Sequence, residues 1–212
     1  IKSNLESKKI LIFLLFISIL ISYLIVKNFD KNLLVNTILI SSAFYLFFIT
    51  VRDFFTKKFK NISQNIAHFG FSLLILSILF NNLLSSEVIT NLKIGESYEN
   101  SKLKILLEDI KQRDEKNYSS VIANFKIISS DGKINKMSPE LRIYNQPNIV
   151  TSEADIKTSL MKDKFIVINL VQNQEYFNVR YQDKPFMLWI WVSVLLLSMG
   201  GILSFLKREY ER

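Results

Sequence analysis

His68 is the only histidine in this chain of 212 residues, which contains no cysteine. It lies in an apolar stretch, residues 62–84, that is long enough to cross a membrane as a helix. At a rise of ~1.5 Å per residue, the imidazole would lie ~9 Å from the start of that helix. Ionisable side chains inside a bilayer are costly, so a histidine at this depth predicts a functional site.

The chemistry open to this histidine is narrow. A neutral imidazole in a membrane helix is suited to binding haem iron axially, with Phe71, Leu74 and Ile75 as an apolar wall for the porphyrin. The opposing ligand must come from elsewhere, because the chain has no second histidine and no cysteine, and for the same reason it cannot build a zinc site alone. Alternatively, the polar residues 63–65 form an interfacial first turn, from which His68 reaches water or a neighbouring backbone. Spacing alone leaves both interpretations open.

Other catalytic arrangements are disfavoured. A Ser-His-Asp triad is excluded, because the one histidine lies in the membrane stretch and the acidic residues do not. The five glycines form no phosphate-binding loop. Charged and aromatic side chains do gather in one later segment: Glu140, Arg142, Tyr144, Glu153 and Asp163. A cluster of this kind is more typical of a solvated face than of a hydrolytic site.

The histidine stretch is one of four apolar runs, the others being residues 10–26, 33–51 and 186–206. We expect residues 1–84 to form three membrane helices and residues 185–212 to form the last one with a short tail. A signal peptide is disfavoured for the first run, because no small-residue cleavage site follows it and a second run comes soon after. Trp189 and Trp191 lie at the depth where indoles favour the membrane interface.

Residues 85–184 differ in kind. They carry nearly equal numbers of basic and acidic residues, and apolar and polar residues alternate in short stretches: 103–108, 121–128, 164–171 and 176–181. This period of two predicts half-buried strands, and residues 130–133 predict a hairpin turn in which Gly132 has a positive φ. The predicted fold is therefore four transmembrane α-helices with one antiparallel β-domain, a small sandwich or open barrel.

The basic residues predict the orientation. If the N-terminus is cytoplasmic, the inside segments carry ten lysines and arginines and the short outside loop carries two, Lys27 and Lys31. This bias puts the β-domain in the periplasm of a bacterium and both termini in the cytoplasm. It also explains the net charge of +8 without a nucleic-acid partner.

Several separated motifs occur in the order found in one family. The segment Ala67-His68-Phe69-Gly70 lies in a helix, before a β-rich block and a final helix that contains tryptophan. The other matching segments are 117–118, 139–144, 151–156, 184–186, 189–191 and 200–201. Together they resemble the C-terminal region of the CcmF family of bacterial cytochrome c haem lyases, over roughly residues 62–212.

The resemblance implies that His68 is one of two axial ligands of a resident haem b. That haem is thought to reduce the incoming haem before its attachment to apocytochrome c. The second ligand, and the tryptophan-rich segment that contacts haem, belong to the upstream part of the same lyase. Further implied partners are apocytochrome c, the haem chaperone and the thiol-reducing partner of the maturation complex, in the inner membrane. Glu140, Arg142, Tyr144, Glu153, Trp189 and Trp191 match motif positions, with partner-binding or structural roles.

Because the chain begins at Ile1 and lacks the upstream segments, we expect a fragment or a later part of a larger product that is not catalytic alone. Within the family, a related lyase dedicated to a nitrite reductase remains a possible assignment. From another class, a haem-free membrane scaffold whose β-domain binds an envelope partner also fits. In that scaffold, His68 would only hydrogen-bond a neighbouring helix, for about 1–2 kcal/mol.

Overall fold

The computed structural model describes residues 2–29, 32–56, 62–170 and 176–210. The chain divides into two compact units. The helical unit comprises Ile1–Leu84 together with Pro185–Arg212, and the β-domain comprises Ser85–Lys184.

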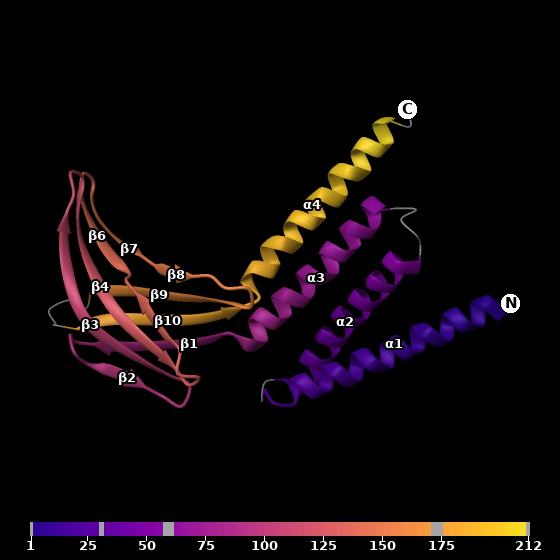
Figure 1. Cartoon of the computed structure of the whole chain (residues 1–212), viewed down its shortest axis with the longest axis horizontal. Coiled ribbons are helices and arrows are strands. Elements are labelled where there is room, and N and C mark those ends of the chain that lie inside the picture. The colour runs from indigo at the N-terminus through magenta and orange to yellow at the C-terminus, as the bar shows by residue number, and fades with distance from the viewer. Residues whose placement is uncertain (1, 30–31, 57–61, 171–175, 211–212) are drawn as a thin grey trace. The chain divides into compact units, whose positions relative to one another are not determined.

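The helical unit contains α1 (Lys2–Val26), α2 (Leu33–Thr56), α3 (Ile62–Leu84) and α4 (Met187–Tyr210), shown in Figure 1. All four are long and apolar enough to cross a membrane. Three helices extend beyond their apolar runs: α1 begins at Lys2, α2 continues to Thr56 and α4 continues to Tyr210. Backbone hydrogen bonding extends into polar flanks because lysine, arginine and glutamate are good helix formers. Several residues used to predict orientation, Lys31, Lys57, Lys58, Lys60 and Arg212, lie outside the described residues.

Within this unit α3 packs against both α2 and α4. Aromatic rings fill the contact with α2, where Phe47 lies 5.5 Å from Phe69 and Phe44 lies 5.7 Å from Phe80, measured between ring centroids. The α4 contact uses small residues instead. A Cβ added to Gly200 would lie 2.6 Å from the backbone nitrogen of Ala67. The two sides of α3 therefore pack by different means.

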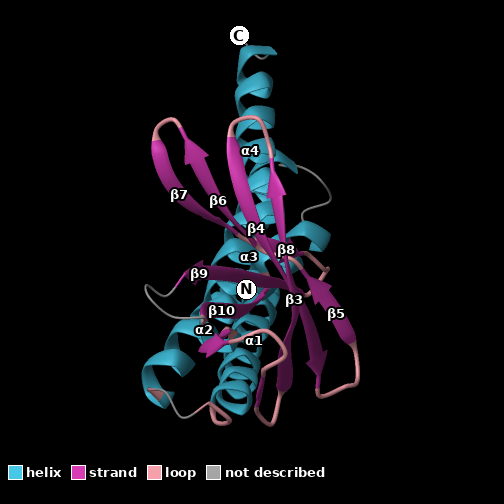
Figure 2. Ribbon diagram, turned by 90° about the vertical axis from the view of Figure 1, so that its left-hand side faces the viewer, coloured by secondary structure: helices cyan, strands magenta, loops and turns pink. Residues whose placement is uncertain are grey.

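The β-domain consists of two sheets (Figures 1 and 2). The first has the order β1-β10-β9-β8, and the second has the order β2-β3-β4-β6-β7 with β5 added to β4. Neighbouring strands of the second sheet run antiparallel, as do β1 with β10 and β8 with β9. The strands are β1 (Ser86–Leu92), β2 (Ser97–Glu99), β3 (Leu103–Asp114), β4 (Tyr118–Ser129), β5 (Ile134–Met137), β6 (Glu140–Asn145), β7 (Asn148–Glu153), β8 (Asp155–Lys157), β9 (Lys162–Leu170) and β10 (Phe177–Pro185). The predicted fold class, membrane helices with one antiparallel β-domain, is confirmed.

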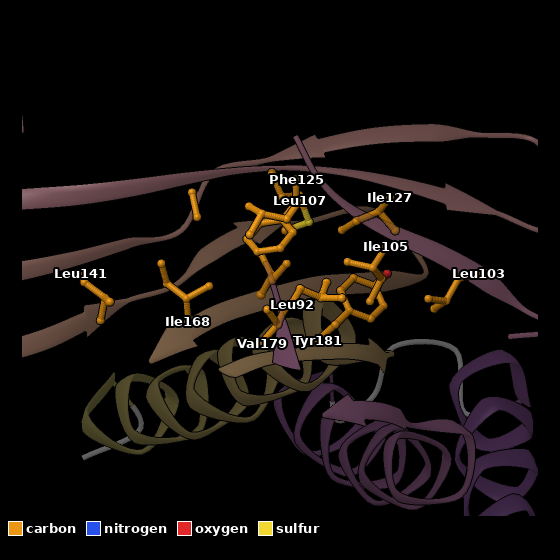
Figure 3. Packing of buried hydrophobic residues seen from close by; sticks show 13 residues of the cluster. Leu92, Leu103, Ile105, Leu107, Phe125, Ile127, Leu141, Ile168, Val179 and Tyr181 are labelled. Carbon is orange, nitrogen blue, oxygen red and sulfur yellow. The ribbon is translucent and has the colours of Figure 1, made fainter. Parts of the chain in front are cut away.

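The core of the β-domain lies between the two sheets (Figure 3). Ile105 and Phe125 reach it from the second sheet, and Ile168 and Tyr181 reach it from the first. Each is at most 1% exposed, and burying one such side chain contributes about 1.5–3 kcal/mol. Alternate residues along β3 and β9 are buried, as the period of two in the sequence predicts.

The predicted hairpin turn is confirmed at the end of β4. Gly132 has a φ of +77°, and its N–H donates to the carbonyl oxygen of Ser129 at 2.9 Å. The strands extend beyond their predicted limits in several places, most clearly where β3 continues to Asp114. Val171, predicted as the last residue of a strand, lies outside the described residues.

Candidate functional site

His68 lies in the second turn of α3 and its side chain is exposed in this chain. Among the described residues, the imidazole has no hydrogen-bond or ion-pair partner. The expected alternative, a hydrogen bond to a neighbouring helix, is therefore not made within the described helices. The histidine is left open to a ligand or a partner from outside this chain.

The packing of α3 explains why His68 is open. Ala67, immediately before it, contacts Gly200 of α4, and Phe69, immediately after it, stacks against Phe47 of α2. Successive residues of a helix point about 100° apart, because there are 3.6 residues per turn. With its two neighbours turned towards α4 and α2, His68 faces neither helix.

We call the exposed side of α3 the His68 face, and define it by Gln64, His68, Phe71, Ile78 and Asn82. These positions recur every three, four or seven residues, which places them on one side of a helix. Neither α2 nor α4 covers this face along the described length of α3.

The centre of the His68 face is apolar. The Phe71 side chain is 48% exposed and the Ile78 side chain 49% exposed, and both are uncovered by the described helices. Of the three residues predicted to form an apolar wall, Phe71 lies on this face and Ile75 is half-buried beside it. Leu74 does not share the face, because six residues after His68 the helix has turned well away from it.

The donor set and its surroundings fit an axial haem ligand. An imidazole without a protein partner can offer a nitrogen to iron, and neighbouring apolar side chains suit the macrocycle. One imidazole supplies one axial position. Within the described residues no group of three or more histidine, cysteine, aspartate or glutamate side chains could hold a metal ion. A six-coordinate haem iron held by His68 would need its second axial ligand from outside the described residues.

Trp189 and Trp191 do not belong to the His68 face. Helices α3 and α4 run antiparallel, because Ala67 near the start of α3 contacts Gly200 late in α4, while Phe80 stacks on Phe186. Trp191 precedes Gly200 by nine residues, which separates the two levels by ~14 Å along the helix axis. The Trp191 side chain is 61% exposed, whereas Trp189 is half-buried.

Three of the charged and aromatic residues that gather in the sequence, Glu140, Arg142 and Tyr144, lie on one strand of the β-domain, β6. We define the Arg142 cluster as Tyr118 and Ser120 of β4 with Glu140, Arg142 and Tyr144 of β6. Tyr118 lies opposite Tyr144 and Ser120 opposite Arg142 in the antiparallel register. Alternate residues of a strand share one face of the sheet, so the spacing of residues 140, 142 and 144 brings the three together.

Arg142 is fully engaged inside this cluster. Its Nη2 donates to Oε1 of Glu140 at 3.0 Å and its Nε to Oε2 at 3.3 Å. The guanidinium lies over the Tyr118 ring, 5.1 Å from its centroid. The hydrogen bond from Arg142 holds the pKa of Glu140 below its usual value, and the bond to Glu140 raises the pKa of Arg142. Because the charges are mutually satisfied, the cluster offers no free acid or base.

Glu153 of β7 lies directly opposite Glu140, and it accepts a hydrogen bond from Oγ1 of Thr151 at 3.3 Å. It shares the face of the Arg142 cluster. Asp163, which the sequence places near these residues, is on β9, in the other sheet.

Sequence reasoning missed the packing role of the residues around His68. Ala67 and Gly70 both lie against α4, since a Cβ on Gly70 would approach the Leu197 backbone nitrogen to 2.8 Å. The signal was present as two small residues three positions apart, a spacing that allows helices to approach closely. Gly201, the residue after Gly200, meets no described atom within 4 Å of its would-be Cβ.

Comparisons with known proteins agree with this architecture. Residues 83–185 match the family model described as CcmF C-terminal beta-sandwich. The chain is 28% identical over 148 residues to cytochrome c-type biogenesis protein CcmF of Pseudomonas fluorescens, a match that covers 70% of this chain and 22% of that protein. It is 32% identical over 119 residues to cytochrome c-type biogenesis protein ccl1 of Rhodobacter capsulatus, a match that covers 56% of this chain and 18% of that protein.

A solved structure shares the fold. The protein described as Cytochrome c Heme Lyase CcmF aligns with a TM-score of 0.64 at 15% identity, over 90% of this chain and 33% of that chain. The chain spans 22% of the length of the first curated relatives it matches. The β-domain thus matches the family model of the CcmF C-terminal β-sandwich, and the chain is similar to the C-terminal region of CcmF proteins and shares the fold of a solved one.

Proposed function

We propose that this chain is the C-terminal part of a cytochrome c haem lyase, in which His68 is one axial ligand of a resident haem b. The observation that carries the proposal is the uncovered imidazole on the His68 face. The residues on either side of it, Ala67 and Phe69, contact α4 and α2. Similarity to CcmF proteins supports it, because relatives over the same region have names that describe cytochrome c-type biogenesis.

The residues of this chain have separate tasks in the proposal. His68 holds one coordination position, and Phe71 and Ile78 keep water from that side of the helix. Ala67 and Gly70 fix the rotation of α3 against α4 and so the direction of the imidazole. When bound, a bis-imidazole haem supplies low-spin electron transfer, with its potential set by burial. The second imidazole comes from the upstream part of the same lyase.

The β-domain serves as a positioning module in this proposal. In the orientation given by the basic residues, it lies in the periplasm and both termini lie in the cytoplasm, across a bacterial inner membrane. Its partners there are apocytochrome c, the haem chaperone and the thiol-reducing protein of the maturation complex. The Arg142 cluster and Glu153 contribute a polar face, since their charged groups are held by hydrogen bonds between alternate residues of β6 and of β7.

The test is a spectrum of the assembled protein. The chain is expressed together with the upstream part of the lyase, and haem content and absorption are measured in the purified membrane protein. We expect a b-type spectrum that His68→Ala weakens or abolishes, because one axial ligand is lost. His68→Gly with added imidazole should restore part of it, since free imidazole can enter the vacated position.

Asn82→Ala is the matched control, because Asn82 is exposed on the same face near the other end of α3. It should leave the spectrum unchanged. An unaltered spectrum in His68→Ala, with helix content preserved by circular dichroism, would falsify the ligand assignment. That result would favour a haem-free scaffold.

A further inference from the structure

One end of the β-domain contains a basic pocket that the proposed function does not use. It lies between the β4–β5 turn and the β8–β9 turn and has a volume of about 320 Å³. Its lining residues are Ser129, Asp131, Lys133, Asn135, Lys157, Thr158, Ser159, Lys162 and Lys164. Four lysines thus surround one carboxylate, in a domain whose overall charge is nearly balanced.

Lys164 distinguishes this pocket from an ordinary lysine-rich surface. The residue is only 8% exposed, and its Nζ donates to Oγ of Ser129 at 3.2 Å. No carboxylate of the described residues forms an ion pair with it. Burial lowers the pKa of this amine. Asp183 and Asp131 attract this ammonium without forming an ion pair with it, so a negative group bound in the pocket would further lower the cost of burying its charge.

The other lysines leave excess positive charge at the pocket. Lys162 reaches Asp183 at 3.8 Å and Lys133 reaches Asp131 at 3.6 Å, both long ion pairs in which the lysine side chain is largely exposed. Lys157 is exposed and has no ion pair among the described residues. Exposed ion pairs at such distances contribute little, so these amines remain available to a ligand.

The turns that carry the lysines are fixed by short-range hydrogen bonds. Ser159 Oγ donates to the carbonyl oxygen of Lys162 at 2.6 Å and accepts from the Lys162 N–H at 3.2 Å. In the other turn, the Lys133 N–H donates to Oδ1 of Asp131 at 3.1 Å. Local bonds of this type hold turns in one conformation, so the pocket is preformed.

We propose that this pocket binds a multiply charged oxyanion, a phosphate or a carboxylate group. Lysine ammonium groups bind such anions as mobile point charges, and the hydroxyl of Thr158 can add a hydrogen bond. The site is independent of the haem proposal, because every residue that lines it belongs to the β-domain.

The experiment uses the full chain in detergent micelles, titrated with inorganic pyrophosphate or with citrate, and with chloride at matched ionic strength. Binding is followed by NMR shifts of the lysine side chains and by calorimetry. We expect saturable binding of pyrophosphate, citrate or both, and none of chloride. Lys164→Met should lower the affinity for the anion roughly tenfold, because one close charge is removed, and Lys157→Gln should lower the affinity severalfold.

Lys116→Gln is the matched control, since Lys116 is equally exposed but lies outside the pocket. It should leave the affinity unchanged. Preference for pyrophosphate identifies a phosphate ligand, and preference for citrate identifies a carboxylate ligand. Two results would overturn the proposal: binding that does not saturate, or an equal loss of anion affinity in Lys116→Gln and Lys157→Gln. Either would show that the anions are attracted only by the overall positive charge of the surface. Lys157 is exposed, so this comparison stands even if Lys164→Met disturbs folding.

Discussion

His68 and Arg142 are both polar side chains next to apolar surroundings, but their hydrogen bonding differs. Arg142 finds a carboxylate and an aromatic ring within its own sheet. His68 has no partner among the described residues. A group whose bonding capacity is satisfied within the chain stabilises the fold, whereas an unsatisfied one in an apolar setting is retained for a ligand or a partner.

Glu140→Gln should destabilise the β-domain by about 1–2 kcal/mol, because a charge-assisted pair of hydrogen bonds to Arg142 is replaced by weaker ones. The pair is protected from solvent, with 24% of the Glu140 side chain and 29% of the Arg142 side chain exposed. Hydrogen exchange of the β6 amides in the full chain measures the loss. Glu99→Gln is the control, since its ion pair with Lys104 is exposed and should change stability by less than about 0.5 kcal/mol.

The same pair gives a pH dependence with a definite sign. The folded pKa of Glu140 is lowered from the ordinary value of 4.5. Its contribution to stability is therefore full above that value and is lost as the pH falls through the lower folded pKa. The stability difference between the parent chain and Glu140→Gln should shrink on acidification below pH 4.5. A difference that grew with acid would contradict the assigned pairing.

Helix α3 combines two roles by dividing them among its faces. Small residues face α4, aromatic residues face α2, and the His68 face is left uncovered. Because the imidazole direction follows from the rotation of α3, the packing residues on the other faces determine where His68 points. The segment Ala67-His68-Phe69-Gly70 is thus one packing and positioning unit.

Gly200→Ala should disrupt the contact between α3 and α4, because the added Cβ would lie 2.6 Å from the Ala67 nitrogen and 2.7 Å from its Cβ. Inserting a methyl group into a tight contact costs about 1–3 kcal/mol. The measurement is thermal unfolding of the helices in detergent, followed by circular dichroism.

Gly201→Ala provides the control one residue away, where no described atom lies within 4 Å of the would-be Cβ. This change should be neutral or stabilising by up to ~1 kcal/mol, since alanine is the better helix former. Equal losses in the two variants would show that the close approach at Gly200 is unimportant.

The described residues contain four helices that are long and apolar enough to cross a membrane, and the β-domain comes between α3 and α4 in the chain. If each helix crosses the membrane once, the β-domain and the segment after α2 lie on opposite sides. The chain has no cysteine, so single cysteines can report the side directly.

Ser101→Cys in the β-domain should react with a membrane-impermeant maleimide in cells whose inner membrane is intact. Thr56→Cys, at the end of α2, should react only after that membrane is opened. Both positions are exposed, so differences in reactivity report the membrane side. The reverse pattern would invert the orientation taken from the basic residues.

The sequence alone determined the fold class. Four apolar runs of bilayer length and a block with a period of two require no knowledge of distant contacts, because bilayer thickness and strand geometry act locally. The Gly132 turn was predictable for the same reason. The first residue of α1 and the last residue of α2 were harder to predict from the sequence, since helical hydrogen bonding continues into polar flanks.

Only the tertiary structure decided which side of α3 is open and which small residues meet α4. It also separated Trp191 from the level of His68, and it brought Ser129 to Lys164 from another strand. Each of these facts depends on two segments distant in sequence, whose relative rotation and register are fixed by packing and not by local periodicity. The sequence identified a histidine of interest, but the packing of α3 left it available.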